Sequence, residues 1–372
     1  MRNVNKFLFI LITPILPACN AQQVMRPIPG EAVTHTAPHA SEEVPTLSIT
    51  PSAVLKTLPP TVSSAYITPT ISPEYIRESY NTEEWSHYIR NAGIITKGTD
   101  SNLWFGMSNG LWSFDGTQWE HFPREEKEDE YWNSGLAIAP NGTVWYSLNS
   151  EGVSSLTDGV WQDFPIDLNI SDNTVWSVAT SPDNNAWVGT RFSAYKYDGL
   201  SWSKLTGSEG EAPEFTLSMV ADPEGSMWFG DVEGVVRYFD GETWSVFPPE
   251  TYLENVPLGL KAIGHMQIGP DGALWFSGTQ IGVVHFDGIT WEVIPIPARS
   301  DAGVRDYPFV VSSEGDLWIS TIGGFTVSRY RDGNWTVFEN MPFLYVRDIE
   351  EGPDGAIWFA TDNGIYRYMS SD

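Results

Sequence analysis

The sequence predicts an all-β fold, a seven-bladed β-propeller of four-stranded blades, and three observations predict it. The 372 residues include 17 Trp and 33 Gly, which favours strands joined by many turns. A tryptophan flanked by apolar residues recurs at spacings of 40 to 47 residues, the length of one propeller blade. The last of these units lacks its final strand, and a matching strand lies near the start of the repeats. The recurring tryptophans are Trp104, Trp145, Trp187, Trp228, Trp275, Trp318 and Trp358.

Each unit reads as four short strands, named a to d in chain order. A turn such as "GPDGALW" or "APNGTVW" precedes the first tryptophan, where Gly supplies the positive φ of a tight hairpin. A run such as "GVVHFDG" follows as strand c, and a second tryptophan opens strand d. Because these tryptophans hold fixed positions in every unit, we expect them to fill space between neighbouring blades. The second column is Trp119, Trp161, Trp202, Trp244, Trp291 and Trp335.

The ring is predicted to close through its N-terminal strand. The last unit, "VRDIEEGPDGAIWFATDNGIYRYMSSD", ends after strand c. The segment "EEWSHYI" at residues 83–89 resembles a strand d without the three strands before it. We therefore expect it to take the outermost position of the seventh blade, since an open ring would expose two blade faces and a strand edge.

The N-terminal region reads as an export signal and a tether. Arg2 and Lys6 precede an apolar run of about ten residues, too short to span a bilayer. It ends in "LPAC", which resembles the lipobox of bacterial lipoproteins. That resemblance implies a signal peptide at 1–18 and a diacylated Cys19 that anchors the protein in a bacterial membrane. The alternative is an ordinary signal peptide with a chance cysteine. Residues 19–79, rich in Pro, Ser and Thr, are predicted to be a disordered tether, and residues 80–372 the propeller.

Charge and motif content exclude several functions. The net charge is −28, and its acidic excess lies within residues 80–372, so nucleic acid is excluded as a partner. Cys19 is the one cysteine, which excludes a disulfide framework and a cysteine-based metal site. The motifs of hydrolases, zinc proteases and nucleotide-binding proteins are missing. We therefore assign no catalytic residue, metal or cofactor, and expect a monomer.

The repeat as a whole resembles the two-component regulator propeller repeat. The pattern is P-[DN]-G-x-[hydrophobic]-W, then G-[hydrophobic]-x-x-[hydrophobic]-D-G, then W-x-x-[FVIL], and it covers residues 83–372. The resemblance implies an exported, extracytoplasmic recognition or sensor propeller that binds a small ligand, a glycan or a protein partner without catalysis. A protein-interaction scaffold is the alternative within the same fold.

"GPDGALWF" and "GPDGAIWF" also resemble the repeats of streptogramin lyases, propellers that cleave an ester by elimination. That resemblance implies a histidine, a glutamate and a magnesium ion on one face of the ring. His265 precedes one such repeat, but Ser277, Gly278 and Thr279 follow its strand without a carboxylate where the partner glutamate would be expected. A lyase of this kind is the enzymatic alternative.

A ligand site is predicted on the face that carries the d–a and b–c connections. The d–a connections are long and differ from blade to blade, whereas the a–b turns are short and uniform. The residues near the start of each strand a mix aromatic, charged and small side chains, as a sugar or peptide site requires. The alternative is that these side chains only plug the channel mouth. The predicted site consists of Trp132, Trp176, Tyr307, His265, Arg347 and Asp348, with Arg191 and Asp231 from b–c loops at its rim.

Overall fold

The computed structural model describes most of the repeat region. The described residues are 70–71, 85–88, 92–107, 109–124, 135–147, 152–164, 174–253, 261–279, 281–294, 296, 308–321, 326–338, 341–343 and 345–369. They belong to one compact unit, Ala53–Asp372. The predicted signal peptide, Cys19 and nearly all of the predicted tether lie outside them. Within the described part of the chain, no helix is long and apolar enough to cross a bilayer.

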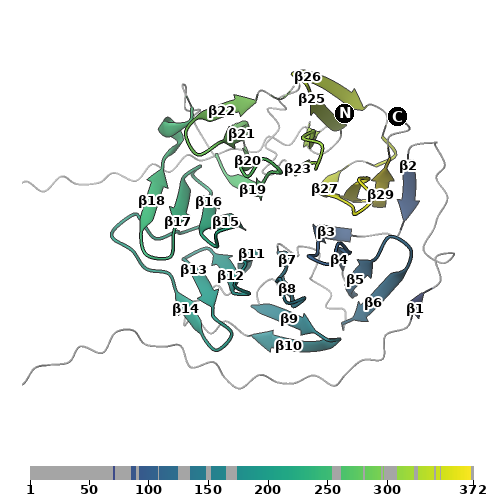
Figure 1. The fold of residues 1–372 in the computed structure, drawn as a ribbon, viewed down its shortest axis with the longest axis horizontal. Coiled ribbons are helices and arrows are strands. Elements are labelled where there is room, and N and C mark those ends of the chain that lie inside the picture. The colour runs from purple at the N-terminus through teal and green to yellow at the C-terminus, as the bar shows by residue number, and fades with distance from the viewer. Residues whose placement is uncertain are drawn as a thin grey trace, which may run out of the picture. The chain divides into compact units, whose positions relative to one another are not determined.

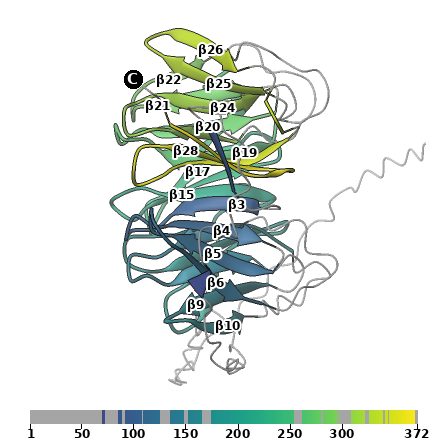
Figure 2. The same cartoon turned by 90° about the vertical axis from the view of Figure 1, so that its right-hand side faces the viewer.

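The described strands form seven antiparallel sheets arranged as a ring, which confirms the predicted propeller (Figure 1). In each sheet the strands run from the axis outward in the order a to d. The inner strands of successive blades are neighbours, and the last contacts the first. Seen from the side, the strands of all blades lie in one layer (Figure 2).

The first four blades are as follows. Blade 1 contains β3 (Ala92–Lys97), β4 (Leu103–Met107), β5 (Gly110–Phe114) and β6 (Trp119–Pro123). Blade 2 contains β7 (Leu136–Ile138), β8 (Val144–Ser147), β9 (Val153–Thr157) and β10 (Val160–Phe164). Blade 3 contains β11 (Val175–Thr180), β12 (Ala186–Thr190), β13 (Ala194–Tyr197) and β14 (Trp202–Lys204). Blade 4 contains β15 (Thr216–Ala221), β16 (Met227–Asp231), β17 (Val236–Phe239) and β18 (Trp244–Phe247), and the short 3-10 helix η3 (Pro249–Thr251) follows it.

The remaining blades complete the circle. Blade 5 contains β19 (Ile263–Ile268), β20 (Leu274–Gly278), β21 (Gly282–Phe286) and β22 (Trp291–Ile294). Blade 6 contains β23 (Phe309–Val311), β24 (Leu317–Thr321), β25 (Thr326–Arg331) and β26 (Asn334–Phe338). Blade 7 contains β27 (Val346–Glu351), β28 (Ile357–Thr361), β29 (Gly364–Tyr368) and, from the other end of the repeat region, β2 (Trp85–Tyr88).

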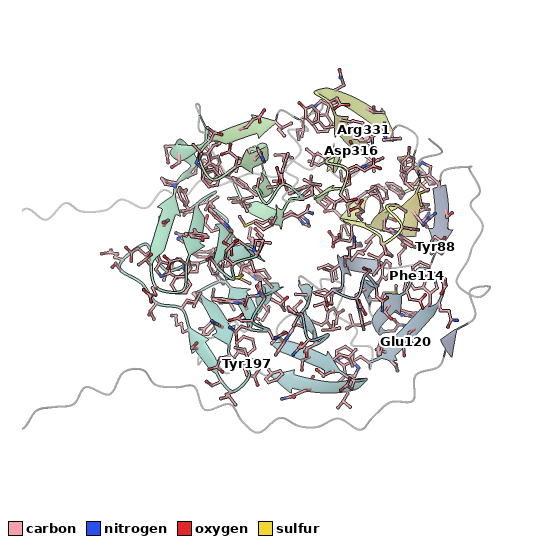
Figure 3. The ribbon with its side chains drawn as sticks, viewed as in Figure 1. Tyr88, Phe114, Glu120, Tyr197, Asp316 and Arg331 are labelled. Carbon is pink, nitrogen blue, oxygen red and sulfur yellow. The ribbon has the colours of Figure 1, made fainter. Side chains whose placement is uncertain are left out.

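Strand β2 closes the ring as predicted. It pairs antiparallel with β29, with Trp85 opposite Tyr368 and Tyr88 opposite Ile365. Because side chains alternate along a strand, β2 contacts both neighbouring blades. The Trp85 ring lies 6.3 Å from that of Phe338 in blade 6, and the Tyr88 ring lies 6.0 Å from that of Trp119 in blade 1. Figure 3 shows Tyr88 on this strand, next to blade 1.

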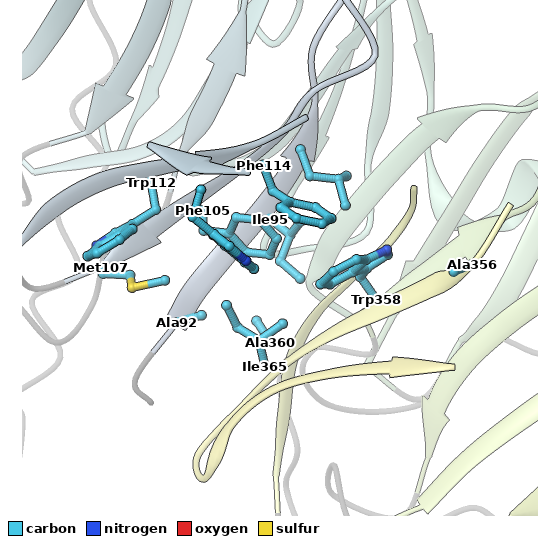
Figure 4. Close-up of a cluster of buried hydrophobic side chains, with 12 residues drawn as sticks. Ala92, Ile95, Phe105, Met107, Trp112, Phe114, Ala356, Trp358, Ala360 and Ile365 are labelled. Atoms are coloured by element: carbon cyan, nitrogen blue, oxygen red, sulfur yellow. The ribbon is translucent and has the colours of Figure 1, made fainter. Parts of the chain in front are cut away.

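The core between blades 7 and 1 shows how the tryptophan columns pack. Trp358 is fully buried, and Trp119 keeps 2% of its surface exposed. Their ring centroids are 6.3 Å apart in an edge-on arrangement. Phe105 and Phe114 of blade 1 complete the cluster (Figure 4). Both columns therefore bridge adjacent blades, as expected from their periodicity.

The acidic residues of the a–b turns have a structural role that needs no metal. In blade 7, one oxygen of Asp354 accepts the N–H of Ala356 within the turn, and the other accepts from Arg367 at 2.6 Å. The Arg367 guanidinium also lies over the Trp358 ring at 5.9 Å. The turn, strand b and strand c are thus held by one cluster. Equivalent sets are Asp183, Trp187 and Lys196 in blade 3 and Asp271, Trp275 and His285 in blade 5.

A short strand adds to the outer edge of blade 1. Thr70–Ile71, labelled β1, pairs antiparallel with β6, with Thr70 opposite Glu120 and Ile71 opposite Trp119. Glu120 is marked on this outer strand in Figure 3. These two residues belong to the segment predicted to be a tether, so one point of that segment contacts the propeller.

We expect loss of β2 to destroy cooperative folding, because it exposes the edge of β29 and the faces of blades 1 and 6. A chain without residues 1–90 should unfold without a cooperative transition, whereas one without residues 1–75 should keep it. Trp85→Ala should lower the free energy of unfolding by about 3–5 kcal/mol in urea denaturation.

The control for this substitution is Ser86→Ala on the same strand, which should change stability by less than about 0.5 kcal/mol. A sharp, fully cooperative melt of the fragment 91–372 would contradict closure by β2.

Candidate functional site

The axis of the ring contains a cavity of about 330 Å³, lined by residues of all seven inner strands or their starts. Most of the residues that line it are apolar, such as Ile95, Val178 and Met219, but polar groups contribute about half of its surface. Hydroxyl groups of the wall come from β3, β11 and β15, and larger polar side chains come from β3, β19 and β27. They include Lys97, His265, Gln267, Asp348 and Glu350. Two of the predicted site residues, His265 and Asp348, therefore share one cavity.

Several polar side chains of this wall join one blade to the next. Ser177 Oγ donates to the carbonyl of Thr216 at 3.3 Å, and Ser218 Oγ donates to that of Ile263 at 2.7 Å. Gln267 exchanges two hydrogen bonds with the backbone of Val311. Inner strands have no strand neighbour on the axis side, so these side chains satisfy backbone groups that would otherwise be buried without partners.

Asp348 has the same inter-blade role at the closing junction. Its Oδ2 accepts the N–H of Ile95 in blade 1 at 2.9 Å, and its Oδ1 accepts the N–H of Ile349. Burial nevertheless raises the pKa of Asp348 from 3.8 to about 7 against the lowering effect of both bonds. Two residues on, burial and the nearby Asp348 raise the pKa of Glu350 from 4.5 to about 8, against the attraction of Lys97. The junction between blades 7 and 1 thus contains two proton-binding carboxyl groups.

His265 lies on β19, the inner strand of blade 5. Its ring packs edge-on against Phe309 with centroids 5.1 Å apart. Burial lowers the pKa of His265 from 6.5 to about 4, although a hydrogen bond with the backbone of Phe309 favours the charged form. The side chain keeps some accessible surface, toward the channel. At neutral pH it is an uncharged imidazole between two blades.

A second cluster forms on the face of the d–a and b–c connections, the mouth face. The half-buried Trp176 lies with its ring 6.3 Å from that of Phe215. The exposed Arg191 places its guanidinium 5.9 Å from the Phe215 ring and 5.4 Å from the Phe192 ring. We call Trp176, Arg191, Phe192 and Phe215 the mouth cluster. It combines three aromatic faces with one cation, which suits a ligand that stacks and carries negative charge.

Phe215 adopts a backbone conformation that bulky residues rarely take. Its φ is 51°, and such a conformation costs on the order of 1–3 kcal/mol unless the surroundings hold it. Here the N–H of Phe215 donates to the carbonyl of Arg191 at 2.9 Å. The bond ties the d–a connection of blade 3 to its b–c loop, and this aims the Phe215 ring between Trp176 and Arg191.

Two further predicted residues that the structure describes, Arg347 and Asp231, do not line the cavity. Arg347 is half-buried, lies 6.0 Å from the Tyr345 ring, and forms no ion pair within the described part of the chain. Asp231 ends β16 and is 5% exposed, with an ion pair to Arg237 at 2.6 Å and bonds from two turn N–H groups. Trp132 and Tyr307 lie outside the described residues. The structure thus places His265 and Asp348 on the channel wall and Trp176 and Arg191 in the mouth cluster, and neither group includes Arg347 or Asp231.

Phe215, Phe192 and Glu350 were not predicted. Phe215 ends the loop "GSEGEAPEF", and its proximity to Arg191 depends on a fold-back that no local pattern reveals. Glu350 could have been found from its spacing, because residues two apart on a strand face the same side. Ser177, Ser218, His265 and Asp348 each lie ten residues before the first tryptophan of their blade. The sequence repeat alone therefore places these four hydrogen-bonding residues at equivalent positions.

The described residues offer no group of three or more His, Cys, Asp or Glu side chains able to hold a metal ion.

Comparison with known proteins establishes the fold. The sequence matches no family model and no curated protein. A streptogramin B lyase structure matches with a TM-score of 0.62 and 15% identity over 82% of this chain and 99% of that one. The extracellular domain of a putative one-component system from B. thetaiotaomicron matches with a TM-score of 0.59 and 12% identity, over 78% of this chain and 40% of that one. The structure of YCF48 bound to D1 peptide matches with a TM-score of 0.56 and 17% identity, over 79% of this chain and all of that one.

At these identities the likeness shows a common propeller fold. Both kinds of propeller that the repeat resembles, the extracellular domains of regulatory systems and the streptogramin lyases, are among the matched structures. This chain spans less than half of the length of the extracellular domain that it matches.

The channel groups predict a pH-dependent stability. Asp348 and Glu350 have raised pKa values in the folded state, so their contribution to stability is fully present below about pH 4 and declines as the pH rises through 7 and 8. His265 acts in the opposite direction, because its lowered pKa gives stability that is present above pH 6.5 and declines as the pH falls toward 4. Between pH 6.5 and 8 the carboxyl groups dominate, so the melting temperature should fall with rising pH.

The double variant Asp348→Asn/Glu350→Gln should flatten this fall, measured by thermal unfolding at half-unit pH steps. Asp115→Asn, on the solvent-exposed c–d turn of blade 1, is the control. Hydrogen bonds from Gln118 and Thr117 lower the pKa of Asp115, so this variant should leave the slope between pH 6.5 and 8 unchanged. An unaltered slope in the double variant would show that the channel carboxyl groups do not bind these protons.

Proposed function

We propose that this protein is an exported, non-catalytic recognition propeller that binds a ligand on its mouth face. The observation that carries the proposal is the mouth cluster, in which a strained Phe215 is held against Trp176 and Arg191. Aromatic faces next to one cation are a surface for a sugar ring or a peptide side chain with an acidic group nearby. Structural packing alone would not require a strained aromatic residue at a partly exposed position.

The wider setting supports recognition. The matched extracellular domain belongs to a putative one-component system, and the matched YCF48 structure holds a peptide. We propose by analogy that this propeller acts outside the cytoplasm, as a sensor or as a scaffold for a protein partner. We propose that it is anchored to a bacterial membrane, at the cell surface or in the outer membrane. The anchor is the lipid on Cys19 that the lipobox-like "LPAC" implies.

A screen by thermal shift tests the proposal with oligosaccharides and peptides as probes, since a ligand that binds the folded state raises its apparent stability. For the probe with the largest shift, Trp176→Ala and Arg191→Ala should each weaken binding by at least ~1 kcal/mol in calorimetric titration.

Leu200→Ala is the matched control, because Leu200 is 83% exposed in the same blade but on the face of the a–b turns. It should bind with unchanged affinity. Full binding by the Trp176→Ala and Arg191→Ala variants would move the site away from the mouth cluster.

One observation favours a lyase as the second candidate. His265 lines the same cavity as Asp348 and Glu350, which supplies carboxyl groups that the local sequence around β20 lacks. The matched structures include a catalytically inactive virginiamycin B lyase from Staphylococcus aureus with quinupristin.

Incubation with quinupristin and magnesium, followed by mass spectrometry, distinguishes the two candidates. Recognition without catalysis predicts no conversion of quinupristin, both in the unaltered chain and in His265→Ala. Turnover that His265→Ala abolishes, while the melting temperature is retained, would replace the recognition proposal with the lyase.

A further inference from the structure

The exposed hydrophobic surface of the described residues is confined to one side of the ring. Large exposed apolar side chains occur in blades 3 to 6, and the other three blades have none among their described residues. One of them, Phe192, belongs to the mouth cluster. Three others lie on consecutive outer strands at equivalent positions, two residues after the second tryptophan. They are Val246 on β18, Val293 on β22 and Val337 on β26, with exposed fractions of 39%, 37% and 41%.

In the other four blades the residue at this position is polar. In three of them it stacks on an aromatic ring or forms an ion pair. His121 of blade 1 stacks on Trp112 at 4.1 Å. Asp163 of blade 2 forms an ion pair with Arg124 of blade 1 at 2.7 Å. The fourth residue at this position is the exposed Lys204 of blade 3, and His87 of blade 7 stacks on Tyr366 at 4.5 Å. Blades 4 to 6 therefore differ from the other blades in having an exposed valine where the others have a polar residue.

The exposure of the outer-strand tryptophans also differs between the two groups of blades. Trp119, Trp161 and Trp202 are 2–4% exposed, whereas Trp244, Trp291 and Trp335 in blades 4 to 6 are only half-buried. Each outer strand of blades 4 to 6 thus shows an indole and a valine on the same side, since residues two apart face the same way. We call this surface of β18, β22 and β26 the outer valine edge.

The edge is also open to strand pairing. Among the described strands, β18, β22 and β26 end their sheets and have a partner on one side alone. The equivalent strand of blade 1, β6, carries β1 as an additional strand. This shows that an outer edge of this propeller accepts an extended segment. Unpaired edges with exposed β-branched residues are sites for such pairing.

We propose that the outer valine edge binds an extended, basic and β-branched segment of a partner protein by strand addition. Exposed acidic residues flank the valines, including Asp240, Glu242, Asp287 and Glu292, and the chain carries a net charge of −28. A basic segment complements this charge. A second copy of the chain repeats the same charge and would be repelled. The surface is separate from the mouth cluster, so the inference does not depend on the ligand proposed there.

The test uses the full chain and two synthetic probes, an alternating Lys-Val octapeptide and its Glu-Val counterpart. We expect binding of the Lys-Val probe in calorimetric titration and no binding of the Glu-Val probe. A single octapeptide pairs with one strand edge, and β22 and β26 belong to different blades. Val293→Lys should therefore weaken binding of the Lys-Val probe at β22 at least 10-fold, and Val337→Lys should do so at β26. Lysine is tolerated at this position of blade 3, as Lys204, so both variants should fold.

Gln162→Lys is the control, because it adds the same charge to the outer strand of blade 2 and should retain the affinity within 2-fold. On binding, amide hydrogen exchange should slow on β18, β22 or β26. Equal weakening by Gln162→Lys would reduce the effect to general charge attraction and overturn the proposal. Binding of both probes alike, or of neither, would overturn it as well.

Discussion

The pairing of β2 with β29 is the interaction on which the rest of the structure depends. It joins residues near the start and the end of the repeat region through a four-residue register, Trp85 opposite Tyr368 to Tyr88 opposite Ile365. A blade buries its faces against two neighbours, so a ring with one incomplete blade loses packing on both sides at once. Tyr88 and Trp85 contact blades 1 and 6 respectively.

The axis of the ring places a second demand on the sequence. Inner strands lack a strand partner toward the channel, and side chains such as Ser218 and Asp348 supply the missing hydrogen bonds across blades. A polar residue on the channel wall therefore has a structural reason to be there. This is why the mixture of residues near the channel mouth is a weaker sign of ligand binding than the mouth cluster, where Phe215 is held in an unfavourable conformation.

The blades are similar in backbone but unequal in surface. Polar side chains engage the outer strands of blades 1, 2 and 7, as with Asp163 and Arg124, while blades 4 to 6 expose valines and half-buried indoles. A repeated scaffold allows such differences because each blade packs mainly through its faces, which leaves the outer edge free to vary. Two surfaces with different chemistry, one aromatic and cationic, the other apolar and acidic, are thereby available on one ring.

The sequence by itself determined the number of blades, their four-strand pattern and the closure by residues 83–89, because each depends on periodicity and on a strand missing from the last repeat. It also identified Trp176, Arg191, His265 and Asp348 as residues of chemical interest. Tertiary structure alone decided that His265 and Asp348 share the channel wall and that Trp176 meets Arg191 through Phe215. The physical reason is that these contacts cross between loops or blades, where spacing along the chain carries no information on distance. The raised pKa values of Asp348 and Glu350 likewise arise from burial within the closed ring, a property that no local pattern contains.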